Sequence, residues 1–142
     1  MKLHPIFVHF PIGLFTIAFI LEIIEFATKD RFKNSAFLLL FFSFLFSIVA
    51  VQTGNVDAQN LIFSKEAEEI FILHRDSANL FLVTSAAIFM FKLYILLKFK
   101  SPSPRLLLIL LGLYLVGLLF VFRAAYFGMK LVFEHGVGLK LN

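Results

Sequence analysis

Four long stretches of the chain carry almost no charge, and this feature constrains the fold more than any other. No Asp, Glu, Lys or Arg occurs from Leu3 to Leu21, from Asn34 to Val56 or from Leu106 to Phe122. A fourth stretch, Ser77 to Leu97, contains only Lys92. A helix that crosses a bilayer needs about 20 mostly apolar residues. The pattern therefore predicts four membrane-spanning helices, near residues 6–28, 35–54, 74–98 and 105–130.

The composition agrees with this expectation. Of 142 residues, 61% are hydrophobic and 15% are charged, whereas soluble domains are about 45–50% apolar and about 25% charged. A soluble enzyme, a disordered chain and a nucleic-acid-binding domain are all poor fits, despite the net charge of +4. The absence of Cys rules out disulfides and thiolate ligands. We expect one all-α domain, residues 1–142, folded as a four-helix bundle in a lipid bilayer, with no internal repeat evident.

Basic residues gather in two predicted loops, 28–35 and 98–105, which four consecutive spans place on one side of the membrane: Lys29, Arg31, Lys33, Lys98, Lys100 and Arg105. Cytoplasmic loops carry an excess of Lys and Arg. Both termini are therefore expected outside the cytoplasm of a multi-pass inner-membrane protein. The first helix lacks a small-residue cleavage site after a charged segment, so it is interpreted as a retained span.

The four histidines, His4, His9, His74 and His135, all fall at the extracytoplasmic end of this topology. Histidine is a common ligand of metals and haem. In a continuous helix His9 would lie about 7.5 Å deeper than His4. We therefore expect His9 to be the buried ligand and His4 an outer group. His74 shares a helical face with the small residues Ala78 and Ser85, which favours an inward direction.

Charged residues near the spans allow two interpretations each. Asp57 either orients an imidazole or belongs to the turn that ends the second helix. Arg123 either pairs with Asp57 or a haem propionate, or extends toward the outer headgroups. Glu22 and Glu25 are expected to form an interfacial charge cluster with the nearby Lys29. Lys92 is expected to extend toward the inner surface.

The segment His4-Pro5-Ile6-Phe7-Val8-His9-Phe10-Pro11 resembles the opening motif of a family of small bacterial membrane proteins, DUF2231. Weaker similarities follow at Thr53–Ala58, at His74 with Asn79, and at Gly128–Val137, so the resemblance covers essentially the whole chain. It implies a four-span protein. Relatives fused to cytochrome c or Rieske-type modules imply a redox context outside the cytoplasm.

The leading hypothesis is a bundle that binds b-type haem for electron transfer, with His9 and His74 as axial ligands. His135 and Arg123 are further candidates for contacting this cofactor. Alternatively, three or four imidazoles from His4, His9, His74 and His135, with Asp57, bind Zn²⁺ or copper. A membrane scaffold without a cofactor is a second class of function, and a proton or solute transporter is a third. The sequence does not decide whether the chain is an enzyme. Under these hypotheses, the expected protein partners are an extracytoplasmic redox protein and a second copy of the chain.

Overall fold

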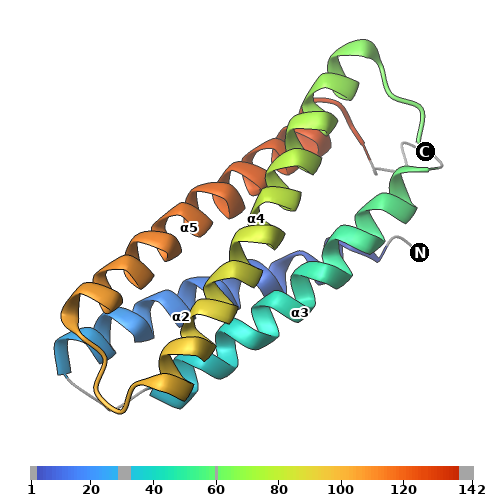
Figure 1. The fold of residues 1–142 in the computed structure, drawn as a ribbon. Helices are drawn as coiled ribbons and strands as arrows, with labels where there is room; N and C mark the ends of the chain where they lie inside the picture. Colours follow the sequence, from blue (N-terminus) through green and yellow to red (C-terminus); the bar gives the residue numbers. More distant parts are fainter. Residues whose placement is uncertain (1–2, 29–32, 60, 138–142) are drawn as a thin grey trace.

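The computed structural model describes residues 3–28, 33–59 and 61–137, and this part of the chain is an antiparallel bundle of long helices (Figure 1). The basic residues Lys29 and Arg31 of the first predicted loop lie outside the described residues. The helices are α1 (His4–Phe7), α2 (His9–Thr28), α3 (Lys33–Ala58), α4 (Lys65–Lys98) and α5 (Pro104–Phe133). The start of α1, the end of α5 and the connection from α3 to α4 lie at one end, here called the termini end (Figure 1). The opposite end, with the end of α2, the start of α3 and the α4–α5 connection, is called the loop end.

Four helical segments are long and apolar enough to cross a membrane, and α1 with α2 forms the first of them. The predicted fold class is therefore confirmed. The outward faces are apolar: the exposed fraction is 70% for Leu119 and 68% for Val83. Lipid is the solvent that makes such apolar faces favourable, and long helices suit it because nearly all their backbone polar groups are bonded within the helix.

Two helix boundaries differ from the sequence-based expectation. The first span has a short break at Val8 between α1 and α2. Pro11 explains it, because proline has no N–H to bond the carbonyl of Phe7 four residues earlier. The third span begins at Lys65, well before residue 74. Ser64 caps this earlier start by accepting a hydrogen bond from the Ala67 N–H at 3.2 Å, which is a common way to begin a helix.

The bundle consists of two equivalent hairpins, a first hairpin of residues 4–58 and a second of residues 65–133. Within each, the two long helices pack closely together (Figure 1). Buried positions recur at a spacing of 70 residues between α2 and α4 and of 74 residues between α3 and α5. The spacing of 70 relates Pro11 to Phe81, Phe15 to Ser85, Ala18 to Ile88, Glu22 to Lys92 and Glu25 to Ile95; the spacing of 74 relates Ala36 to Leu110, Leu40 to Tyr114, Ser43 to Gly117, Ser47 to Val121 and Ala50 to Ala124. The structure thus reveals a repeat that inspection of the sequence missed, because burial recurs along the helices while residue identity recurs at only a few positions, such as Ala50 and Ala124.

Aromatic rings join the two hairpins at mid-height. The Phe15 ring lies 5.0 Å from the Phe81 ring and 5.1 Å from the Tyr114 ring, measured between centroids. All three side chains are buried. This cluster separates the interior at the termini end from the interior at the loop end.

Candidate functional site

A cleft of about 480 Å³ opens at the termini end between the two hairpins. Every helix contributes to its walls, which are mainly apolar. Its polar lining residues are His4, His9, Asn55, Asp57, His74, Arg75 and Asn79. The volume falls within the range of about 300–1,000 Å³ typical of small-molecule and cofactor sites.

His4 and His74 face each other across the interior of this end. Their ring centroids are 5.9 Å apart and the ring planes are nearly perpendicular, at 81°. Both side chains are partly buried. The two residues are 70 positions apart and occupy equivalent places in the two hairpins, so the repeat itself produces the pair.

Each imidazole is anchored in the same way to the partner helix of its own hairpin. His4 Nδ1 lies 2.8 Å from the carbonyl oxygen of Ala50, and His74 Nδ1 lies 2.8 Å from that of Ala124. A carbonyl oxygen only accepts hydrogen bonds, so Nδ1 is the donor in both rings. In a neutral imidazole the other nitrogen, Nε2, then carries a lone pair. A hydrogen bond from the ring nitrogen that does not bind the metal is the support that metal-ligating histidines usually have.

A glycine lies beside each ring. A Cβ atom on Gly54 would lie 3.0 Å from His4 Nδ1, and one on Gly128 would lie 3.1 Å from His74 Cε1. Each glycine comes four residues after the anchoring alanine, Ala50 or Ala124. These two Ala-x3-Gly segments are small-x3-small patterns of the kind that bring membrane helices close together. They are the sequence signal that could have indicated where the two imidazoles pack.

Asp57 acts on the histidine backbone. Its Oδ2 accepts a hydrogen bond from the His4 N–H at 3.1 Å. An N–H at the start of a helix has no partner within the helix, so the carboxylate satisfies it and ties α1 to the end of α3. Asp57 therefore positions His4, although the imidazole itself is oriented by Ala50.

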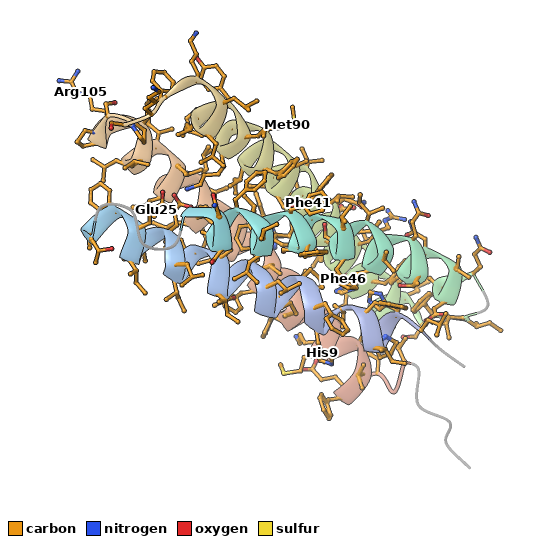
Figure 2. The ribbon with its side chains drawn as sticks, turned by 90° about the horizontal axis from the view of Figure 1, so that it is seen from below. His9, Glu25, Phe41, Phe46, Met90 and Arg105 are labelled. Atoms are coloured by element: carbon orange, nitrogen blue, oxygen red, sulfur yellow. The ribbon has the colours of Figure 1, made fainter. Side chains whose placement is uncertain are left out.

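The relative burial expected for His4 and His9 is wrong. His9 lines the cleft but is exposed, whereas His4 is partly buried and in contact with His74. Five residues correspond to about 140° around a helix, so only one of the two can face the interior, and the bundle selects His4. Figure 2 shows His9 at the termini end.

Two other expected site residues are absent from the lining of the cleft. His135 is absent from its lining, and Arg123 is exposed, with its guanidinium 5.6 Å from the ring centroid of Phe127 on the same helix. Arg123 makes no ion pair with Asp57 in the described part of the chain. Arg75 lines the cleft, while its side chain stays 47% exposed.

Within residues 3–28, 33–59 and 61–137, no three His, Cys, Asp or Glu side chains come close enough to share a metal ion. The three or four imidazoles proposed for Zn²⁺ or copper are therefore not gathered there. The described structure offers a pair of imidazoles.

The loop end holds charged residues whose arrangement the sequence did not reveal. Lys92 Nζ lies 2.7 Å from Glu22 Oε1 and 3.0 Å from Glu25 Oε2. All three side chains are buried, so the expected interfacial cluster and the expected extension of Lys92 toward the surface are wrong. Lys29, the expected partner of the glutamates, lies outside the described residues. Figure 2 shows Glu25 near the loop end, far from His9.

The fold and the cleft together define a small multi-pass membrane protein with a histidine pair between two helical hairpins. The chain belongs to the DUF2231 family, described as a predicted membrane protein, whose family model matches residues 1–141. This match confirms the resemblance seen in the opening motif. No curated protein and no solved structure matches the chain.

Proposed function

We propose that the protein binds b-type haem between His4 and His74 and exchanges electrons at the outer face of a bacterial inner membrane. The observation that carries this proposal is the anchored histidine pair, with both Nδ1 atoms on backbone carbonyls. A haem would need few ligands from the protein, because its macrocycle supplies the others. Two imidazoles are therefore a sufficient set.

The geometry and the chemistry of the cleft fit this group. The His4 and His74 ring centroids lie 5.9 Å apart, so both imidazoles would be within reach of one iron. The apolar walls suit the macrocycle. Arg75 lines the cleft half exposed, in a loose ion pair with Asp76 at 3.7 Å, and its guanidinium would be the group to hold a propionate.

In this assignment His4 replaces His9 as the partner of His74, and Arg75 replaces Arg123 at the propionates. The bound haem supplies one-electron exchange between two iron oxidation states. The protein orients the two imidazoles through Ala50 and Ala124 and excludes water with the apolar walls. A Zn²⁺ or copper ion has weaker support, because the described residues offer it two imidazoles and no third side-chain ligand nearby.

The proposal is tested by the absorption spectrum and metal content of the protein purified in detergent, expressed with a haem supply. We expect a Soret band with α bands on reduction. His4→Ala and His74→Ala should each remove most of the haem, and the double variant should add little, because both residues act at one centre. Haem content should fall on acidification, since protons compete for the ligand nitrogens.

His9→Ala is the matched control, because this histidine lines the same cleft without contacting the pair. It should retain most of the haem. Full haem content in both His4→Ala and His74→Ala would refute the shared site. A colourless wild-type protein with stoichiometric zinc or copper would indicate a metal site. A colourless wild-type protein without metal would indicate a membrane scaffold without a cofactor.

A further inference from the structure

The buried ions at the loop end carry an uneven charge. Two carboxylates, Glu22 and Glu25, share the single ammonium group of Lys92, with side chains 2%, 8% and 1% exposed respectively. If all three were ionised, the group would carry one net negative charge inside the bundle. An uncompensated charge at this depth is costly, whereas one bound proton makes the group neutral.

The hydrogen bonds indicate which carboxylate holds that proton. Glu22 Oε1 is bonded to Lys92, while Glu22 Oε2 is buried and has no hydrogen-bond partner in the described structure. An ionised carboxylate whose oxygen is buried and unpartnered loses its solvation without replacement. Glu25 is less buried, so it retains more solvation as an anion. Protonation at Glu22 therefore removes the largest penalty.

The other elements around the group add a single titratable side chain. From α5, the Tyr114 hydroxyl is buried and also has no partner in the described structure. α3 has no ionisable residue between Asn34 and Val56. No cation besides Lys92 thus compensates the two carboxylates within the described residues of the spans.

We propose that Glu22, Glu25 and Lys92 form a proton-binding site, in which one solvent-derived proton resides on the Glu22 carboxyl. A hydronium ion or buffer acid transfers its proton to Glu22, and the group becomes one carboxylic acid, one carboxylate and one ammonium. The reverse transfer returns the proton to solvent. Glu22 and Lys92 occupy equivalent positions of the two hairpins, as do His4 and His74 at the other end. The Phe15 cluster lies between the two ends, so this site is separate from the cleft.

Infrared spectroscopy of the purified protein, in a detergent without ester groups and near pH 8, tests this directly. The remaining carboxyl groups in the described structure are not buried, and carboxyl groups in water are ionised at this pH. We expect one protonated-carboxyl C=O band in the wild type, which shifts in D₂O. Glu22→Gln and Glu25→Gln should each abolish it, because one carboxylate then balances Lys92. Lys92→Met should double it.

Size-exclusion chromatography and thermal melts show which variants are folded. The wild-type spectrum decides first, since a protein without the band overturns the proposal whatever the variants do. A band that persists in either folded glutamate variant also overturns it, as does a band that does not shift in D₂O. None of these outcomes depends on haem.

Discussion

Single glycines determine where the imidazoles of the candidate site can lie. His4 rests against Gly54 and His74 against Gly128, and in both places an added Cβ would lie 3.0–3.1 Å from a ring atom. Such contacts are tighter than ordinary van der Waals distances. The rings can reach the carbonyls of Ala50 and Ala124 because the glycines leave this space.

Gly54→Ala and Gly128→Ala should therefore each displace one imidazole and lower haem content relative to the wild type. The measurement is the Soret absorbance per protein after expression with haem. Gly13→Ala is the matched control, because a Cβ there meets nothing within 4 Å. It should retain haem and gain roughly 0.5–1 kcal/mol in stability, as alanine is the better helix former. Unchanged haem content in both Gly54→Ala and Gly128→Ala would contradict the proposed role of these glycines in placing the imidazoles.

At the scale of helices, the contact between the hairpins depends on one close approach of α5 to α2. A Cβ on Gly117 would lie 2.5 Å from Phe15 Cζ. Phe15 is fully buried between Phe81 and Tyr114, so it has little room to move. The glycine thus sets the distance between the two helices.

Gly117→Ala should destabilise the bundle by about 1–3 kcal/mol, the usual cost of overpacking a filled core. Gly112→Ala on the same helix meets nothing within 4 Å and should be neutral or slightly stabilising. Thermal unfolding in detergent compares the two variants with the wild type. Equal melting temperatures for Gly117→Ala and Gly112→Ala would mean that the helices can move apart at this contact without loss of stability.

At the scale of the whole molecule, the repeat places a polar pair at each end of the interior, with the Phe15 cluster between them. The histidine pair and the Glu22–Lys92 pair both arise from residues 70 positions apart. No internal repeat was evident in the sequence, and a proton or solute transporter was the third hypothesis drawn from it. The structure contains a repeat of burial and, at the loop end, two buried carboxylates.

The orientation in the membrane is the remaining prediction at this scale. The 98–105 loop, with Lys98, Lys100 and Arg105, lies at the loop end, and Figure 2 shows Arg105 there. The positive-inside rule then places the termini end outside. A phosphatase reporter fused to the C-terminus should be active and a fluorescent reporter dark, with the opposite result for fusions in the 98–105 loop. The reversed pattern would place the histidine cleft on the cytoplasmic side.

The sequence by itself determined the number of spans, the antiparallel order and the gathering of His4, His9 and His74 at one end. These features depend on the cost of placing charge in lipid, and that cost is summed locally along the chain. The opening motif also identified the family. Helix ends were less well determined, as the early start of α4 at Lys65 shows, because a cap such as Ser64 extends a helix beyond its apolar segment.

Only the tertiary structure decided which side chains face inward. The spans are apolar on nearly every side, so the sequence carries little periodic signal of the inward face. The choice of His4 over His9, the place of Arg75 in the cleft and the burial of Glu22 with Lys92 all depend on that face. It is set by the close packing of the two hairpins, in which small residues such as Gly54, Gly117 and Gly128 fix how the helices approach one another.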